Sequence, residues 1–166
     1  SGERGLLAVG GPIPIGYYKD PDKSAQTFRR FADRVWSVPG DWATVEHDGT
    51  ITLLGRGSVC INTAGEKVYP EEVEETLKLH PDVADANVVG LPDERWGSSV
   101  TAVVSLTDGA QPDGARPDEA ALVAHCKEHL AGYKCPKRIV FVDRVQRGPN
   151  GKPDYRWASE VAGAGV

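Results

Sequence analysis

The chain has 166 residues, of which 40% are hydrophobic and 26% are charged, and its formal net charge is -5. A chain of this length can bury one ordinary core, or one modest core with an appended piece. Because acidic residues outnumber basic ones and no run of like charges occurs, nucleic-acid binding and a polybasic membrane contact are excluded as starting hypotheses.

The cysteine and hydropathy patterns predict a cytoplasmic protein without a transmembrane segment. The three cysteines, Cys60, Cys126 and Cys135, are odd in number and lack CxxC spacing, so neither a disulfide framework nor a structural zinc site is indicated. No apolar stretch approaches the roughly 18 residues that cross a bilayer, and no signal segment opens the chain. Since the sequence contains no methionine, we expect it to derive from a longer or processed protein.

The first 55 residues are dense in glycine and proline. Short apolar runs at Leu6–Val9 and Ile51–Leu54 predict small strands, and Asp48-Gly49 is a turn signal before the second run. Between the two strands the pattern predicts a helix over Asp22–Phe31, with its first residue as the N-cap. This part holds too little apolar material for an independent core, so we expect it to pack against chain outside this sequence.

From residue 60 the pattern predicts a self-sufficient fold. A helix is predicted over 70–80, because a proline opens it, glutamates fill its first half and Lys78 stands near its end. Strands are predicted over Ala86–Leu91 and Val100–Thr107, the second with alternating apolar residues on one side.

The remaining elements complete a small α+β domain. Asp108–Pro117 is predicted as a surface loop, followed by a helix over Asp118–Leu130 that is capped by its first residue and closed by Gly132. Ile139–Val142 is a continuous apolar run, as expected of an inner strand. A last helix is predicted over Asp154–Val161. The order helix, strand, strand, helix, strand, helix predicts a short β-sheet covered by about three helices.

Four segments carry motifs whose order and spacing are informative together. The first is SGERGLLAVGGPIPIGYYKDPDKSAQTF, and the second is PGDWATVEHDGTITLLGR, which contains Asp41 and Arg56. The third is GRGSVCINTAGEKVYPEEVEETL, in which Gly57-Ser58 is a conformationally permissive pair and a glycine-containing turn follows. The fourth runs from YKCPKRIVFVDRV to RGPNGKPDYR and contains Lys152.

Lys152 is a candidate anion-binding residue on local grounds. It follows the turn Pro149-Asn150-Gly151 and precedes a predicted helix, so its ammonium group is expected beside unpaired backbone N–H groups. The segment is not a P-loop, because Gln146 stands where that motif needs glycine and Pro153 where it needs serine or threonine.

In these four segments, and in their order, the chain resembles the adenylate-forming superfamily of acyl-CoA synthetases, adenylation domains of peptide synthetases and luciferases. The resemblance implies that residues 1–57 are the final β-rich segment of a large N-terminal adenylate-binding domain, and residues 58–166 a mobile C-terminal domain. It implies an acid–thiol ligase that activates a carboxylic acid, expected to be a fatty acid, as acyl-AMP and transfers it to coenzyme A. ATP, Mg²⁺, coenzyme A and the rest of the N-terminal domain are the implied partners. No cofactor is expected to bind this chain tightly, and the chain alone is expected to be inactive.

By the same resemblance, three residues act in adenylation. Asp41 would accept hydrogen bonds from the ribose hydroxyls of ATP, and Arg56 would contact the nucleotide. These roles suit an acceptor-only carboxylate and a guanidinium with several fixed donors. Lys152 would enter the active site for adenylation, as the catalytic residue of this chain.

The third segment resembles the hinge and the loop of the thioester step. The C-terminal domain would pivot at Ser58, where many members have Asp or Lys. A loop that contains Gly65, Glu66 and Lys67 would then face the active site, with Ala64 in place of a common glycine.

The sequence leaves alternative functions open. The parent protein could be an adenylation domain that loads a carrier protein, or the chain could be a binding module with a degenerate site. Within the acyl-CoA synthetases, the acid could be a fatty acid, a sterol side-chain acid or an aryl acid.

Individual residues also have alternative interpretations. Without the motifs that flank them, Asp41 would be interpreted as a turn residue and Arg56 as the solvated end of a strand. His125 and His129 have i, i+4 spacing, but Cys126 replaces the glutamate of the HExxH motif, so we favour two exposed helix residues and predict no metal. The glutamates of the 70–80 helix are interpreted as a solvated acidic face rather than as paired catalytic acids.

Overall fold

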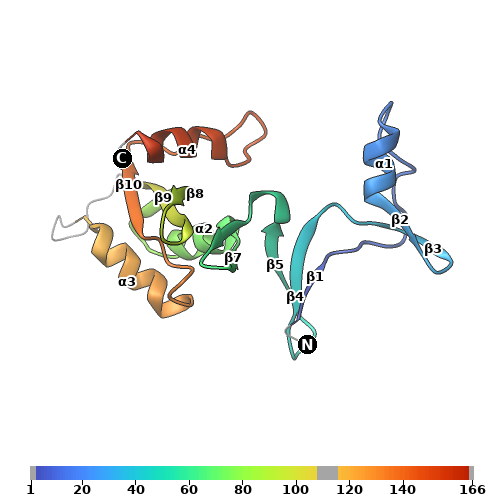
Figure 1. Cartoon of the computed structure of the whole chain (residues 1–166), viewed down its shortest axis with the longest axis horizontal. Helices are drawn as coiled ribbons and strands as arrows, with labels where there is room; N and C mark the ends of the chain where they lie inside the picture. Colours follow the sequence, from blue (N-terminus) through green and yellow to red (C-terminus); the bar gives the residue numbers. More distant parts are fainter. Residues whose placement is uncertain (1–2, 108–115, 165–166) are drawn as a thin grey trace. The chain divides into compact units, whose positions relative to one another are not determined.

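The computed structural model describes residues 3–107 and 116–164. It divides into two compact units, Ser1–Ser58 and Val59–Val166, which we call unit 1 and unit 2 (Figure 1). Among the described residues, no helix has the length and apolar character needed to span a membrane. The predicted surface loop at 108–117 falls mostly outside the described residues.

Unit 1 consists of small antiparallel sheets and one short helix. β1, β4 and β5 form a three-stranded sheet in the order β1-β4-β5, and β2 pairs with β3 in a hairpin. Its elements, in chain order, are β1 (Arg4–Leu6), α1 (Pro21–Thr27), β2 (Phe28–Phe31), β3 (Arg34–Ser37), β4 (Asp41–Val45) and β5 (Ile51–Arg56).

The predicted helix over Asp22–Phe31 is wrong at both ends. The N-cap is Asp20, whose side chain accepts a hydrogen bond of 3.0 Å from the N–H of Lys23. The helix ends at Thr27, and Phe28–Phe31 form a strand because their backbone pairs with β3. Phe28 and Phe31 have the i, i+3 spacing that is typical of a helix face, but strand pairing with a distant segment has overridden this local signal.

The predicted strand over Leu6–Val9 is also displaced. β1 covers Arg4–Leu6, and Val9 forms only an isolated bridge with Ser37. The strand predicted from Ile51 is confirmed as β5.

Unit 1 has a thin core. Its buried hydrophobic residues are Val38, Ala43 and Leu54, whereas Tyr18 and Leu53 are largely exposed. Since burial of apolar surface is the main favourable term in folding, the described part of unit 1 gains little stability from its own packing.

Unit 2 contains the predicted succession of helices and strands, preceded by a hairpin that was not predicted. The short 3-10 helix η1 (Gly57–Val59) crosses the division between the units. The elements that follow are β6 (Ile61–Thr63), β7 (Glu66–Val68), α2 (Pro70–Lys78), β8 (Val83–Asp93), β9 (Gly97–Leu106), α3 (Glu119–His129), β10 (Arg138–Val142) and α4 (Tyr155–Gly163). The α+β prediction for this part is confirmed.

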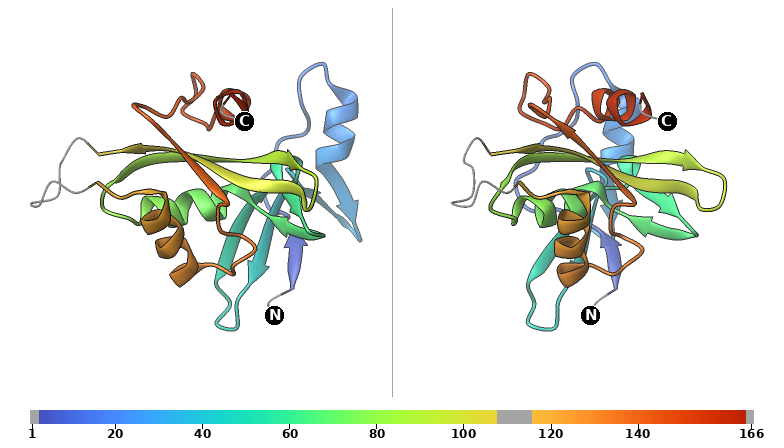
Figure 2. Two further views of the ribbon diagram at one scale, coloured as in Figure 1. Left: turned by 60° about the vertical axis from the view of Figure 1, so that its left-hand side comes forward. Right: turned by 90° about the vertical axis from the view of Figure 1, so that its left-hand side faces the viewer.

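The central sheet of unit 2 is covered on both faces. Its order is β10-β9-β8, with β8 antiparallel and β10 parallel to β9. Helices α2 and α3 cover one face and α4 covers the other (Figure 2). Alternation along β9 sends Val100, Ala102 and Val104 into the first layer and Val103 into the second.

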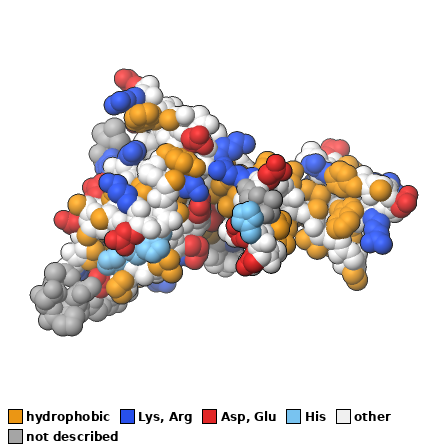
Figure 3. Space-filling view, turned by 90° about the horizontal axis from the view of Figure 1, so that it is seen from below, with side chains coloured by type: hydrophobic (Ala, Val, Ile, Leu, Met, Phe, Trp, Pro, Cys, Tyr) orange, Lys and Arg blue, Asp and Glu red, His pale blue; other side chains and the backbone are white. Residues whose placement is uncertain are grey.

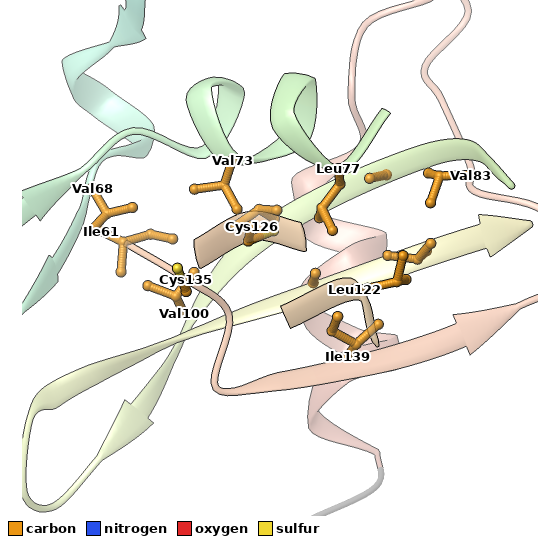
Figure 4. Close-up of a cluster of buried hydrophobic side chains, with 14 residues drawn as sticks. Ile61, Val68, Val73, Leu77, Val83, Val100, Leu122, Cys126, Cys135 and Ile139 are labelled. Atoms are coloured by element: carbon orange, nitrogen blue, oxygen red, sulfur yellow. The ribbon is translucent and has the colours of Figure 1, made fainter. Parts of the chain in front are cut away.

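The larger hydrophobic cluster lies between the sheet and helices α2 and α3 (Figure 4). It includes Val73 and Leu77 from α2, Leu122 from α3, and Ile61 from β6, all of them buried. Val73 and Leu77 therefore share the buried face of α2. The hairpin β6–β7 is fixed to this same layer through Ile61 and Val68.

The prediction that Ile139–Val142 is an inner strand is wrong. β10 is an edge strand that pairs only with β9 in this sheet. Its apolar run has another cause: Ile139 packs into the layer of α2 and α3, and Val142 into the layer of α4. A strand that is covered on both faces can be apolar throughout without being central.

Of the predicted helix caps, Asp118 is present, whereas Asp22 and Gly132 do not cap their helices, and Asp154 is a cap that was not predicted. Asp118 caps α3 by accepting a hydrogen bond from the N–H of Ala121, and Asp154 caps α4 in the same way from Trp157. Gly132 does not close α3, because the chain is already extended at Leu130 (φ -126°, ψ 152°).

Candidate functional site

The two residues predicted to bind nucleotide lie side by side in unit 1. Asp41 opens β4 and Arg56 closes β5, and the antiparallel register places them directly opposite one another. Nε of Arg56 lies 3.1 Å from Oδ1 of Asp41. Both side chains are partly exposed, so this ion pair by itself adds little to stability. The pair places the carboxylate of Asp41, a hydrogen-bond acceptor, and the guanidinium of Arg56, a donor, at the same end of β4 and β5.

The predicted hinge follows directly after this strand pair. At Gly57 an added Cβ would lie 2.7 Å from Nε1 of Trp42, so glycine is required there for close approach to the indole ring. From the sequence we expect Gly57 only to be conformationally permissive, and its close approach to Trp42 is a second reason for glycine at this position. Ser58 lies within η1, and the division between the units follows it. Its role as the pivot stays a prediction.

The loop predicted for the thioester step is a tight hairpin turn between β6 and β7. Ala64 (φ 50°) and Gly65 (φ 83°) both have positive φ, as a type I′ turn requires. Because an alanine rarely adopts this conformation, the turn needs support from outside. The N–H of Ala64 donates to the carbonyl of Trp96 over 2.9 Å and supplies that support. Glu66 and Lys67 follow on β7 and are exposed.

Lys152 has a fixed backbone and an exposed side chain. Its N–H donates to Oδ1 of Asn150 over 3.2 Å, and its carbonyl accepts from the N–H of Gly148 over 2.8 Å. Gly151 has a φ of 75° and donates its N–H to the carbonyl of Gly148. The loop is thus a small structured turn that presents an ammonium group to solvent.

The expected anion site at the start of α4 is only partly available. The helix begins at Tyr155, and Oδ1 of Asp154 accepts from the N–H of Trp157 over 3.0 Å. A capping carboxylate therefore occupies the place where we had expected an unpaired donor beside Lys152. The anion-binding capacity of this loop rests on the Lys152 side chain itself.

Residues 143–154 connect β10 to α4, and we call them the Lys152 loop. Two residues that the sequence did not indicate, Arg147 within this loop and Asp85 on β8, hold it in place. Arg147 makes two hydrogen bonds to the carboxylate of Asp85 on β8, with Nε 2.6 Å from Oδ2, and Nη1 of Arg147 lies 3.3 Å from the carbonyl of Gly151. The pair joins residues 62 positions apart. No local periodicity could have indicated it.

The interpretation of the α2 glutamates as a solvated face is wrong for Glu74. Its side chain is 3% exposed, and it accepts a hydrogen bond of 2.8 Å from the N–H of Val88. Oε2 of Glu74 lies 3.5 Å from the hydroxyl of Tyr155. Burial raises the pKa of Glu74 from 4.5 to about 7. Glu74 thus links α2 to β8 and α4, and only Glu75 of the four glutamates is exposed.

Histidine side chains gather on one surface of unit 2 (Figure 3). His125, Glu128 and His129 could approach a metal ion, with ligand atoms within 4.8 Å of one another. His125 is half-buried rather than exposed, since its Nε2 lies 3.0 Å from the carbonyl of Thr76. Two ligand atoms that each lie about 2.1 Å from one ion can be at most about 4.2 Å apart. The limit of 4.8 Å does not establish such a short separation, so we assign no metal.

The two loops predicted to serve catalysis belong to opposite layers of unit 2. The hairpin of Gly65 is fixed through β6 and β7 to the layer of α2 and α3. Lys152 stands in the loop that leads to α4, which covers the other face of the sheet (Figure 2).

Comparison with known proteins identifies the family. Residues 72–152 match the family described as the AMP-binding enzyme C-terminal domain. The chain is 58% identical, over 96% of its length, to a medium/long-chain-fatty-acid–CoA/3-oxocholest-4-en-26-oate–CoA ligase of Mycobacterium tuberculosis (strain CDC 1551 / Oshkosh). The chain belongs to the adenylate-forming superfamily.

Two further proteins are similar to the chain over nearly all of its length. A 3-oxocholest-4-en-26-oate–CoA ligase of Rhodococcus rhodochrous is 56% identical over 98% of the chain. The o-succinylbenzoate CoA synthetase of Bacillus subtilis, solved with its acyl-adenylate intermediate, superposes with a TM-score of 0.78 at 32% identity, over 91% of this chain and 29% of that one. The chain spans 28% of the length of both curated relatives.

Proposed function

We propose that the chain forms the C-terminal part of an ATP-dependent acyl-CoA synthetase that activates medium- or long-chain fatty acids or a steroid side-chain acid. The observation that carries this proposal is the high identity, over nearly the whole chain, to relatives named for those reactions. A cytoplasmic location belongs to the proposal, and the two buried thiols Cys126 and Cys135, which form no disulfide, support it.

In this proposal the two units have different origins. Residues 1–57 complete the large adenylate-binding domain, which would cover the apolar surface that unit 1 leaves exposed. Residues 58–166 are the mobile C-terminal domain, whose own core supports independent folding.

The first half-reaction forms acyl-AMP. A carboxylate oxygen of the acid attacks the α-phosphorus of ATP, and the bond to pyrophosphate breaks. Both reactants are negatively charged, so the ammonium group of Lys152 can stabilise their approach by contacting the carboxylate and α-phosphate oxygens. Asp41 and Arg56 would hold the ribose and the nucleotide. Mg²⁺ would neutralise phosphate charge, and we assign it no ligand in this chain.

The second half-reaction forms the thioester. The sulfur of coenzyme A attacks the acyl carbonyl carbon, and AMP leaves with the electron pair of the broken bond. Rotation about Ser58 would withdraw Lys152 and bring the hairpin of Gly65, Glu66 and Lys67 to the active site. The attachment of the two loops to opposite layers of unit 2 supports this alternation.

The function is tested with the complete ligase and three kinds of acid: a long-chain fatty acid, a steroid side-chain acid and an aryl acid. We expect ATP-dependent pyrophosphate release and acyl-CoA formation with the first or second acid, and no activity from the 166-residue chain alone. Acyl transfer to a carrier protein instead of coenzyme A would favour the peptide-synthetase type. Absence of pyrophosphate release with every acid would favour a binding module.

Replacing Ser58 by proline is expected to uncouple the two half-reactions. Proline fixes φ, so the variant should form acyl-AMP at a near-normal rate while acyl-CoA release falls about tenfold or more. The measurement compares pyrophosphate release with acyl-CoA release in the complete enzyme.

Ser58→Ala is the matched control for this variant, because it removes the hydroxyl without restricting φ. It should leave both rates near those of the unmodified enzyme. An equal loss of both rates in Ser58→Pro would show that Ser58 is not the pivot.

A further inference from the structure

The guanidinium group of Arg147 joins the Lys152 loop to the central sheet of unit 2. On one side it binds both carboxylate oxygens of Asp85, which lies on β8. On the other side its Nη1 donates to the carbonyl of Gly151, the residue before Lys152. A planar guanidinium with donors in fixed directions can make these contacts together, which a lysine ammonium cannot reproduce.

The sheet side of this connection is itself well held. Oδ1 of Asp85 also accepts from the N–H of Ala86 over 2.9 Å, which fixes the carboxylate on the strand. Burial alone would raise the pKa of Asp85, but the hydrogen bonds from Arg147 and Ala86 outweigh it and leave the pKa below its usual value. Asp85 is therefore ionised, and the ion pair intact, throughout the neutral pH range.

A second contact fixes the start of the same loop. Nδ2 of the buried Asn87, also on β8, donates to the carbonyl of Gln146 over 3.2 Å. β8 thus holds the loop through side chains two residues apart, which point to the same face of the sheet.

Polar contacts, rather than apolar packing, order residues 149–152 of the loop. A hollow of about 750 Å³ lies at this place, lined among others by Asp85, Ser105 and residues 144–149. Pro149, Asn150, Gly151 and Lys152 are all exposed. Since few apolar contacts restrain these residues, loss of the Arg147 contacts should free them.

We infer that Arg147 and Asp85 are positioning residues that hold the Lys152 loop in the geometry used for adenylation. The inference rests on the proposed function, in which Lys152 acts in that half-reaction. Arg147 acts through the backbone of Gly151 and need not touch the substrate. A displacement of the ammonium group by about 1 Å can lower a rate by about 100-fold.

The order of the loop is tested on the 166-residue chain by amide hydrogen exchange. In Arg147→Ala we expect exchange at Gly148 and Gly151 to accelerate about tenfold or more, while the buried strand β9 keeps its protection. Arg144→Ala is the matched control, because it removes an exposed arginine of the same loop. Unchanged exchange at both glycines in Arg147→Ala would overturn the inference, whatever the enzyme does.

The catalytic consequence is tested in the complete ligase. Arg147→Ala and Asp85→Asn should lower the kcat of acyl-AMP formation about 10- to 100-fold, and Arg147→Lys should restore only part of it. Thioester formation from supplied acyl-AMP should stay within about twofold, whereas general unfolding would reduce both steps.

The two proposals fail in different ways. Normal adenylation in Arg147→Ala, together with a strong loss in Lys152→Ala, would overturn the positioning role and leave the proposed function intact. Normal adenylation in both variants would remove Lys152 from the reaction, and the positioning role would fall with it. In that case faster exchange at Gly148 and Gly151 in Arg147→Ala would still show that Arg147 anchors the loop. The proposed function, and not the anchoring contact, would then be the part that is wrong.

Discussion

Replacing Lys152 by alanine in the complete ligase is expected to slow acyl-AMP formation about 100- to 1000-fold. In the proposed function the variant removes an ammonium group that would contact oxygens approaching one another only during adenylation, and loss of one such electrostatic donor typically has an effect of about this size. The backbone of Lys152 is bonded at both its N–H and its carbonyl, so alanine should leave the loop in place. ATP–pyrophosphate exchange measures this step directly.

The same variant should change the thioester step far less, because the loop would by then have left the active site. Acyl-CoA formation from supplied acyl-AMP tests this. Lys127→Ala, which removes an exposed lysine of α3, is the control for loss of positive charge. Near-normal pyrophosphate exchange in a folded Lys152→Ala variant would show that the lysine is only part of a structural turn.

The stability of unit 2 is expected to fall as the pH rises from about 4.5 to about 7, because of Glu74. Burial raises the pKa of its carboxyl from 4.5 to about 7, so in this range the folded state keeps a proton that the unfolded state has lost. The contribution of Glu74 to stability is greatest below pH 4.5, declines through this range and levels off above pH 7. The shift corresponds to about 3 kcal/mol in the free energy of unfolding.

The variant Glu74→Gln should remove most of this pH dependence. The amide has the same shape, its oxygen can accept from the N–H of Val88, and its nitrogen can donate to the hydroxyl of Tyr155. Its stability should be close to that of the unmodified chain at pH 5 and higher at pH 8, by up to about 3 kcal/mol. Urea unfolding followed by circular dichroism at several pH values measures the difference.

The groups around Glu74 define the control. The nearby charge of Glu71 also raises its pKa, while the hydrogen bond from Val88 and the charge of Lys78 lower it. Glu75→Gln removes an exposed carboxylate of the same helix, which pairs with Lys78 at the surface. It should leave the slope of stability against pH nearly unchanged. Parallel slopes for Glu74→Gln and the unmodified chain would show that Glu74 stays ionised in the folded state.

Local sequence signals were sufficient where one residue determines one backbone feature. Pro70 opens α2, and Asp118 caps α3, because the capping hydrogen bond spans only three residues. Alternation along β9 identified the face that packs against α2 and α3, since side chains of a strand point to opposite sides. The motif residues were likewise found by order and spacing along the chain.

Tertiary structure decided every feature that depends on what a residue meets far along the chain. Phe28 and Phe31 have helical spacing, yet pairing with β3 makes their segment a strand. Glu74 belongs to an acidic run that resembles a solvated face, yet β8 and α4 bury it and raise its pKa. Ile139–Val142 resembles an inner strand because both faces are covered, although it lies at an edge.

The same distinction holds for the candidate site. The resemblance to the superfamily indicated Asp41, Arg56 and Lys152 as candidates, because it rests on short motifs that contain them. It could not show that Asp41 and Arg56 face one another, which follows from the register of β4 and β5. Nor could it show that Asp85 holds Arg147, since hydrogen bonds across 62 residues leave no periodic trace in the sequence. Local order along the chain determined which residues are candidates for the chemistry, and packing of distant segments determined how those residues are held.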